Sequence, residues 1–203
     1  YPNKKVMTLY NWITPKKIKI KIKKNKITKF IFGGTIGPAQ NWDNIIRLIV
    51  ELKKNKALFK FHFIGDGKNL NYLKEKIQIL NENVLFIKPK PEEEYIKFLT
   101  KMDIGVISLD QTILFNNIPG KFFSYLETNL FILSDTAYGQ DISKIINNYK
   151  VGLTNNKSNT NLLSNAIKLS KQKINYRILR KKYNRLLKEK FSTEIAYKKL
   201  IKA

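Results

Sequence analysis

The sequence predicts an α/β protein with a Rossmann-like parallel sheet of about six strands and helices on both faces. Apolar runs of about four to six residues alternate with stretches of helical periodicity, which is the pattern of repeated βαβ units. Glycine-rich turns follow several of the apolar runs, as expected where a strand leads into a helix. With 203 residues the chain can bury one sizeable core, so we expect a single domain.

Within that domain the sequence divides into a basic entry segment (1–28), an alternating βα core (29–154) and C-terminal helices (155–203). The basic segment contains Lys16–Lys24, which alternates Lys and Ile with period two. No hairpin partner lies nearby, so an irregular or edge segment is favoured over a regular strand. The core is expected to supply six strands, at Phe30–Phe32, Phe59–Ile64, Val84–Ile87, Ile104–Ser108, Phe131–Ser134 and Val151–Thr154.

Helices are expected between the strands, each with one apolar stripe. The first covers Asp43–Lys54 and the second Asn69–Leu80. A third begins at Pro91, where the three following glutamates complement the positive helix end, so these carboxylates are interpreted as capping groups. A fourth runs from Gly120 to about Thr128 after a long Asn-rich loop. A last helix is expected at Thr193–Ile201. The apolar stripes of the first two helices and of the C-terminal region contain Ile45, Leu48, Ile49, Leu52, Leu70, Leu73, Ile77, Leu80, Leu162, Leu163, Ala166, Ile167, Leu169, Tyr176, Leu179, Tyr183, Leu186 and Leu187.

The net charge of +24 is concentrated in two segments. Residues 1–30 hold ten Lys and no acid, and residues 168–190 hold ten Lys or Arg against one Glu. Three explanations stay open: a composition biased towards Lys, Ile and Asn, an anionic membrane surface, and nucleic acid, in falling order of preference. Without Cys and with one His, the chain has no thiolate or imidazole-rich metal site. No apolar run approaches the ~20 residues that span a bilayer, and a start at Tyr1 indicates a piece of something longer.

Three strand-to-helix or loop-to-helix junctions carry glycine. They are Phe30–Gly37, Phe59–Gly67 and Ile118–Leu126. Such turns let backbone N–H groups approach a phosphate closely, and in an open parallel sheet ligands bind at the carboxyl ends of the strands. The sequence therefore predicts a nucleotide or sugar-phosphate site, with Lys121 adding a full positive charge beside the helix that begins at Gly120.

Together these motifs resemble the C-terminal, donor-nucleotide half of GT-B glycosyltransferases of family 4 (group 1), in the branch that builds bacterial surface polysaccharides. The resemblance covers nearly the whole chain. It rests on the order and spacing of Leu9–Trp12, Phe32–Gln40, Phe63–Gly67, Asn83–Phe86, Met102–Val106 and Pro119–Lys121.

The resemblance implies a site for a nucleotide-sugar donor of UDP or GDP type, with no metal ion and no other cofactor. The turn Lys88–Lys90 is expected to lie against the base, and the diphosphate against the helix at Gly120. No catalytic residue is assigned within this chain. The implied donor-binding residues are Gly33, Gly34, Gly37, Gly65, Asp66, Lys90, Pro119, Gly120, Lys121, Ser124 and Glu127.

The chain departs from the family pattern at the donor ribose. Relatives carry a Glu at the position of Ser124, often with a second Glu at the position of Asn116. Glu127, one turn beyond Ser124, is a candidate substitute, although an exposed surface role is favoured. The Arg and Lys that many members place after the first strand are also missing.

The resemblance implies one half of a retaining hexosyl- or aminosugar-transferase for surface polysaccharide or glycolipid synthesis. It also implies a location in the cytoplasm, with possible peripheral attachment at the inner membrane face. The acceptor, a saccharide or lipid-linked saccharide, would be bound by an N-terminal half that this chain lacks, so the fragment alone is expected to be inactive. Two alternatives stay open. One is a basic nucleic-acid-binding module, although no recognition-helix pattern supports it. The other is a degenerate, non-catalytic glycosyltransferase domain.

Overall fold

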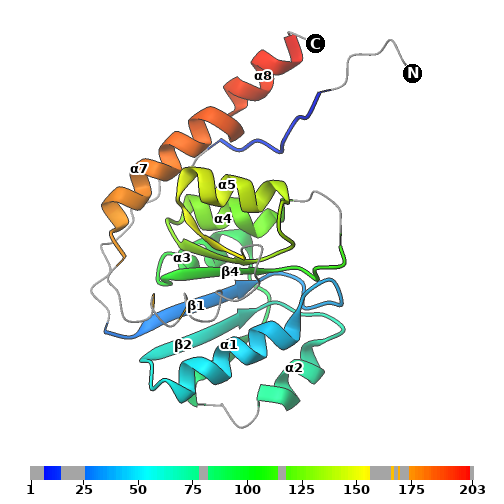
Figure 1. Cartoon of the computed structure of the whole chain (residues 1–203), viewed down its shortest axis with the longest axis vertical. Helices are drawn as coiled ribbons and strands as arrows, with labels where there is room; N and C mark the ends of the chain where they lie inside the picture. The colour runs from blue at the N-terminus through cyan, green and yellow to red at the C-terminus, as the bar shows by residue number, and fades with distance from the viewer. Residues whose placement is uncertain are drawn as a thin grey trace.

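The sheet has six parallel strands in the order β3-β2-β1-β4-β5-β6. A computed structural model describes residues 7–14, 26–77, 82–113, 118–155, 166, 169 and 174–201. The chain first adds strands on one side of β1 and then returns to add β4, β5 and β6 on the other side (Figure 1). The strands are β1 (Thr28–Gly33), β2 (Phe59–Ile64), β3 (Val84–Ile87), β4 (Ile104–Ser108), β5 (Phe131–Asp135) and β6 (Gly152–Thr154).

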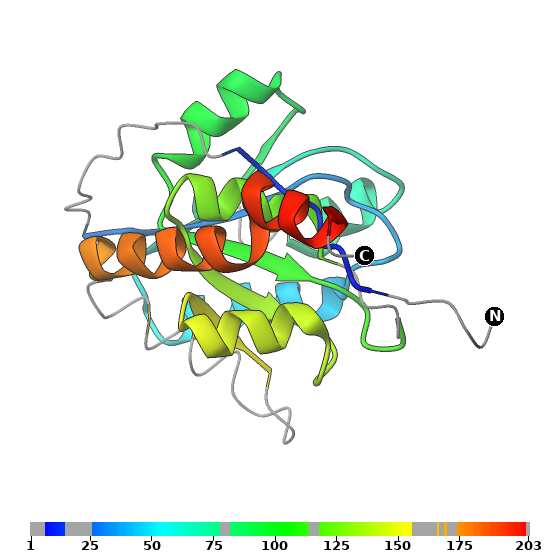
Figure 2. The same ribbon diagram turned by 90° about the horizontal axis from the view of Figure 1, so that it is seen from above.

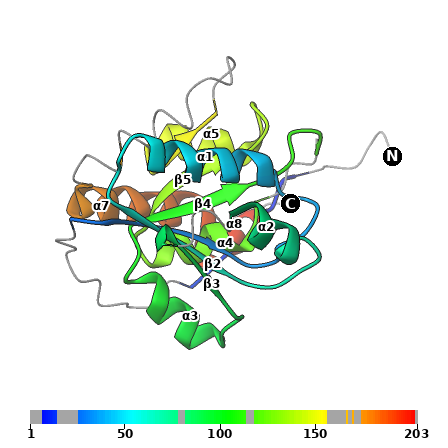
Figure 3. The same cartoon turned by 90° about the horizontal axis from the view of Figure 1, so that it is seen from below.

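Helices cover both faces of the sheet. Helices α1 and α2 lie on one face, whereas α3, α4 and α5 lie on the other, and α7 and α8 run across that second side (Figures 1 and 2). Viewed from below, α1 and α3 lie on opposite sides of the strands (Figure 3). The helices are α1 (Trp42–Lys54), α2 (Leu70–Ile77), α3 (Glu92–Leu99), α4 (Gly120–Glu127), α5 (Asp141–Tyr149), α7 (Tyr176–Leu186), the π-helical turn η2 (Leu187–Phe191) and α8 (Thr193–Ile201).

Alternation along β1 and β2 sends phenylalanines to the α1 side of the sheet. Phe30 and Phe61 stack with ring centroids 5.8 Å apart, and Phe32 meets Trp42 of α1 edge-on at 5.0 Å. The residues between these phenylalanines, Ile31 among them, face α3 and α4 instead and are equally buried. Strand β1 is thus apolar on both faces, as expected for a parallel sheet that is covered on both sides.

The expected strands agree with the observed ones to within two residues at either end, and the fold class is confirmed. The stripes on α1 and α7 face the core as predicted, with Leu52 and Tyr183 fully buried. Helix α5 had no residue range of its own in the sequence-based expectation. Other expectations, namely Lys16–Lys24, Leu80, Asn116, Leu162, Leu163 and Ile167, fall outside the described residues.

The described N-terminal segment lies against the C-terminal helices. Ile13 donates its backbone N–H to the carbonyl of Phe191 (2.9 Å), and the Tyr10 ring meets the Phe191 ring edge-on at 5.7 Å. Figure 1 shows that both described ends leave the body on the same side. Among the described helices, none has the length and apolar character needed to cross a membrane.

The topology leaves a crevice where the winding direction reverses. Strands β1 and β4 are neighbours, but the helices that follow them leave to opposite faces of the sheet. In open α/β sheets this switch point, at the carboxyl ends of the strands, is where ligands bind.

Candidate functional site

A cavity of about 680 Å³ opens at the carboxyl ends of β1, β2, β3 and β4. This volume lies within the range of small-molecule binding sites. The residues around it come from the loops that follow the strands and from the first turns of α3 and α4. They are Gly33, Gly34, Thr35, Ala39, Gln40, Ile64, Gly65, Asp66, Pro89, Lys90, Tyr95, Ser108, Leu109, Pro119, Gly120, Lys121 and Ser124.

The loops after β1 and β2 are packed together at the cavity wall. Gly34 donates its N–H to the carbonyl of Ile64 (2.9 Å), and Ile36 donates to the carbonyl of Asp66 (2.8 Å). Gly65 has a φ of +151°, and a Cβ at this position would lie 1.9 Å from the carbonyl oxygen of Gly34. Only glycine fits there, so the two loops hold each other in a fixed position.

Two tyrosines fix the end of β1 from the other face of the sheet. The buried hydroxyl of Tyr125 accepts the N–H of Gly33 (3.1 Å), and Tyr95 is hydrogen-bonded to Tyr125. A Cβ on Gly33 would lie 2.1 Å from the Tyr95 hydroxyl oxygen. Burial raises the pKa of Tyr95 to about 12, so its phenol is neutral at physiological pH and serves as a hydrogen-bonding group in the wall.

Helix α4 points its N-terminus at the cavity. Pro119 is the N-cap residue and supplies no side-chain hydrogen bond to the helix end. The N–H of Phe122 donates to the carbonyl of Pro119 (2.9 Å), and the N–H groups of this first turn carry the positive end of the helix dipole. A Cβ on Gly120 would meet nothing within 4 Å, so the approach to these N–H groups is open.

The Lys121 side chain folds back from α4 over the end of β1. Its Nζ lies 3.5 Å from the centroid of the fully buried Phe32 ring, and its Cε and Nζ lie beside Gly34. Burial lowers the pKa of Lys121 to about 7. The amine is therefore only partly protonated near neutral pH, less than the full positive charge expected from the sequence, because the ammonium loses water without gaining a counter-charge.

On the β3 side the cavity wall is formed by the Pro89–Lys90 turn. Lys90 Nζ pairs with Glu94 Oε2 at 2.9 Å, one turn into α3. Across the cavity Ser108 joins the end of β4 to α1, because its Oγ accepts the N–H of Asn41 (3.2 Å). Ser108 also approaches the buried carboxylate of Asp135, which accepts a hydrogen bond from the Asn44 side chain (3.0 Å).

The structure brings together all but two of the residues predicted for the donor site. Gly37 does not line the cavity, since its N–H binds Gln40 Oε1 (2.9 Å) and its carbonyl accepts the Trp42 indole N–H (2.7 Å) at the turn into α1. Glu127 is also absent from the lining, while Ser124 is present.

Several lining residues, Tyr95 and Ser108 among them, were not foreseen. The sequence could have indicated Tyr95, because it lies in the first turn of α3, directly after the loop that follows β3. His62, by contrast, is a buried residue of the central strand β2 whose Nδ1 lies 3.1 Å from the carbonyl of Phe30. Within the described residues, no group of three or more His, Cys, Asp or Glu side chains could hold a metal ion.

A six-stranded parallel Rossmann-like sheet with helices on both faces and a crevice at its switch point has the architecture of one half of a GT-B glycosyltransferase. The sequence model described as glycosyl transferases group 1 matches residues 14–111. This match, over a little less than half of the chain, supports a glycosyltransferase group 1 domain and with it a transferase.

Individual relatives agree with this assignment. The chain is 27% identical over 124 residues to a probable glycosyltransferase, WbjE, of Pseudomonas aeruginosa, covering 61% of this chain and 30% of the relative. The structure of an S. aureus TarM mutant in complex with fondaparinux, alpha-GlcNAc-glycerol and UDP superposes with a TM-score of 0.71 at 16% identity, over 100% of this chain and 40% of that one.

A second similar structure is the C-terminal domain of a glycosyl transferase group 1 family protein, LpcC, from Francisella tularensis. It superposes with a TM-score of 0.59 at 18% identity and covers 82% of this chain and 87% of that one. The chain therefore spans less than half the length of WbjE and TarM, but most of the length of the isolated domain.

Proposed function

We propose that this chain is the donor-binding half of a glycosyltransferase and that its cavity holds a nucleotide sugar. The observation that carries the proposal is the convergence, at one cavity, of a glycine turn after β1, the open N-terminus of α4 and the Lys121 Nζ. Helix N-termini and cations bind phosphate groups, so a diphosphate is the ligand that this arrangement fits best. The UDP in the TarM complex supports a nucleoside diphosphate.

In this proposal each wall of the cavity has a separate task. The α4 N-terminus and Lys121 bind the diphosphate and stabilise the charge that develops on it as the glycosyl group leaves, so the reaction proceeds without a metal ion. The Pro89–Lys90 turn lies against the base, and Gly33 and Gly34 face the sugar-phosphate. Ser124 replaces the family carboxylate at the ribose, so recognition there relies on neutral groups.

The acceptor, a saccharide or lipid-linked saccharide, would bind to a second half, as the family resemblance implies, with the anomeric configuration retained. The fragment alone would then bind donor without turnover. The basic segments 1–30 and 168–190 would favour a position near anionic lipids at the inner membrane face, with each Lys contributing about 1 kcal/mol close to the surface.

The test is thermal denaturation of the chain with UDP, GDP, ADP, CMP or a short duplex DNA, at low and moderate salt. A nucleotide at about 100 times its dissociation constant should stabilise the fold by roughly 2.7 kcal/mol. We expect UDP or GDP to stabilise the wild type but not Lys121→Met, and Lys74→Met on α2, outside the cavity, to respond as the wild type does.

Two other outcomes would reject the proposal. DNA binding that weakens steeply as salt rises, with no nucleotide response, would indicate the basic nucleic-acid-binding module. A chain that responds to neither ligand would indicate a degenerate domain.

A further inference from the structure

Lys121 is a largely desolvated lysine without a counter-charge. Its Nζ rests on the face of Phe32, a residue with 0% exposure, and it forms no ion pair with any described residue. The chain has 15 Asp and Glu residues, and every one of them lies in the described part of the chain. No Asp or Glu side chain of the protein therefore pairs with this lysine.

The charged and titratable groups around Lys121 do not supply the missing negative charge. Lys90 in the cavity wall is paired with Glu94, and Tyr95 is neutral. Asp66 is exposed, and its Oδ1 accepts the N–H of Gly67 (2.7 Å). The N-terminus of α4 adds further positive potential next to the lysine. The cavity is thus short of one negative charge, which an anionic ligand would supply.

We propose that the cavity takes up its diphosphate together with one proton, which moves from solvent to the Lys121 amine and makes it an ammonium ion in contact with a phosphate oxygen. This inference rests on the proposed function and adds a reason why the site would prefer a nucleoside diphosphate to a nucleoside. A nucleoside without phosphates has no charge to offer the ammonium and gains nothing from Lys121. A diphosphate gains a charge-assisted hydrogen bond in a partly dehydrated site, where such bonds are strong.

The direction of the pH effect follows from linkage. In the free protein the pKa of Lys121 is about 7, so the amine is mostly neutral above that pH. A bound diphosphate raises this pKa, because a nearby negative charge favours the protonated form. Between the two pKa values, each pH unit should weaken diphosphate binding by up to about tenfold. The last phosphate ionisation, near pH ~6, lies below this window.

The experiment is isothermal titration of the wild-type chain with UDP and GDP, at about pH 7 and about pH 8.5, in two buffers that differ in ionisation enthalpy. We expect uptake of nearly one proton per bound nucleotide at the higher pH and an affinity loss of roughly tenfold or more across the range. Uridine and guanosine should show neither effect.

Variants separate Lys121 from other sources of pH dependence. Lys121→Arg keeps a fixed charge, so it should bind the nucleotides without the proton uptake and without the pH slope. Lys121→Met is neutral at every pH, so any nucleotide binding that remains should be weak and show neither effect. Lys74→Met should keep both, because Lys74 is an exposed residue of α2 outside the cavity.

The outcomes distinguish this inference from the proposed function. Nucleotide binding with constant affinity and no proton uptake would overturn the role of Lys121 and leave the donor site in place. Proton uptake that persists in both Lys121 variants would overturn it as well. If neither nucleotide binds at either pH, the proposed function fails and this inference fails with it.

Discussion

At position 33, the Tyr95 side chain of α3 leaves no room for any residue larger than glycine. The Tyr95 hydroxyl oxygen lies 2.1 Å from the position that a Cβ of residue 33 would take. We expect Gly33→Ala to destabilise the fold by about 1–3 kcal/mol, because overpacking forces either the strand end or Tyr95 to move. Urea denaturation would measure the loss.

A double-mutant cycle assigns this cost to the contact. In a Tyr95→Ala background the Gly33→Ala change should cost at least about 1 kcal/mol less, since residues in contact are not additive. Gly120→Ala is the matched control on steric grounds, because a Cβ at that position meets nothing within 4 Å. If Gly33→Ala costs the same with and without the Tyr95 ring, Tyr95 is not what restricts residue 33.

Lys121 should also leave a signature in the pH dependence of stability. Its pKa is about 7 in the folded chain and near 10.4 when unfolded, so between these values the unfolded state binds the extra proton. The free energy of unfolding therefore rises with pH across this window, by up to about 1.4 kcal/mol per unit. As pH falls towards 7, the protein loses this stability again. We expect Lys121→Met to stabilise the protein most near neutral pH and progressively less towards pH ~10.

Urea denaturation of wild type and Lys121→Met at several pH values measures this difference, in which the other titrating groups cancel. Lys74→Met serves as the control, since it exchanges an exposed lysine on α2. A stability difference that is the same at every pH would mean that Lys121 remains fully charged in the folded chain.

At the scale of elements, α1 depends on the cap at its start. The Asn41 side-chain oxygen accepts the N–H of Asn44 (3.1 Å). Asn41→Ala should cost about 1 kcal/mol of unfolding free energy, whereas Asn41→Asp should keep most of the cap. Asn175→Ala provides a matched comparison, because Asn175 caps α7 in the same way through Ile178 (3.1 Å). Equal stability of Asn41→Ala and wild type would show that the tertiary contacts of α1 make the cap redundant.

The strands were predictable from the sequence because they are short, mainly apolar runs, and β4 is buried at every position. Phe59–Ile64 and Ile104–Ser108 match the structure residue for residue. The π-helical turn η2 was not predictable, since apolar spacing looks the same across an α-helix and a single π turn. Its last residue, Phe191, packs against Tyr10 of the N-terminal segment, a contact between residues far apart in the sequence.

The candidate site was predictable to the extent that it consists of glycine turns at strand ends. Gly33, Gly65 and Gly120 reach one cavity because the carboxyl ends of parallel strands share one edge of the sheet. The contact of Tyr95 with the end of β1 and the lowered pKa of Lys121 both arise from side chains of α3 and α4 that pack against the sheet. Local sequence does not encode such contacts, because they form only when α3 and α4 pack on the sheet.

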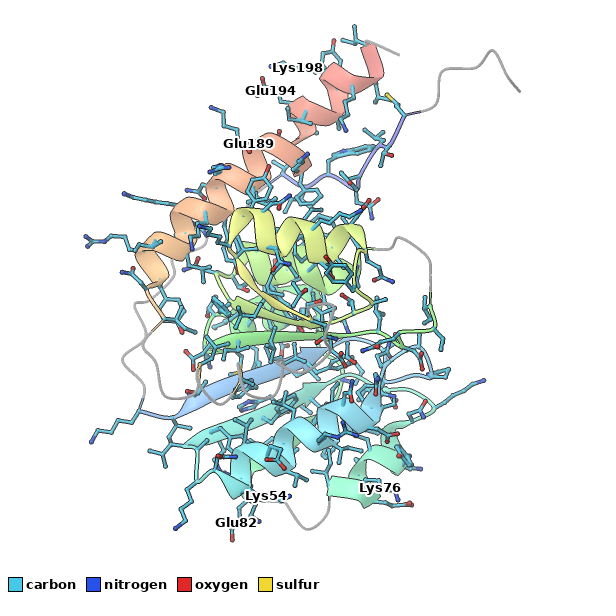
Figure 4. The ribbon with its side chains drawn as sticks, in the orientation of Figure 1. Lys54, Lys76, Glu82, Glu189, Glu194 and Lys198 are labelled. Carbon is cyan, nitrogen blue, oxygen red and sulfur yellow. The ribbon has the colours of Figure 1, made fainter. Side chains whose placement is uncertain are left out.

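At the scale of the whole molecule, charge is unevenly distributed between the body and the C-terminal helices. Figure 4 labels Glu189, Glu194 and Lys198 along η2 and α8, on the opposite side of the sheet from Lys54, Lys76 and Glu82. The acids in the C-terminal stretch are engaged by neighbouring bases, as in the pair Arg185–Glu189 at 3.1 Å. Direct packing of the α7 stripe on the core, together with the contacts of the N-terminal segment, is therefore expected to hold this region to the body, and not these exposed ion pairs.

Tyr10 connects the N-terminal segment to both η2 and α5. Its ring packs edge-on against Phe191, and its hydroxyl donates to Asp141 Oδ2 (3.0 Å) at the start of α5. We expect Tyr10→Ala to destabilise the fold by about 2–4 kcal/mol, through lost ring packing and a lost hydrogen bond. Tyr10→Phe should cost only about 1 kcal/mol, because the ring contact with Phe191 remains.

Trp12 is the matched aromatic control for this prediction, as it is 46% exposed in the same segment. Trp12→Ala should change the unfolding free energy by less than about 1 kcal/mol in urea denaturation. If Tyr10→Ala and Trp12→Ala cost the same small amount, the N-terminal segment does not hold the C-terminal helices. A large loss for Tyr10→Ala alone would mean that residues more than 130 positions apart in the sequence close the fold through one aromatic side chain.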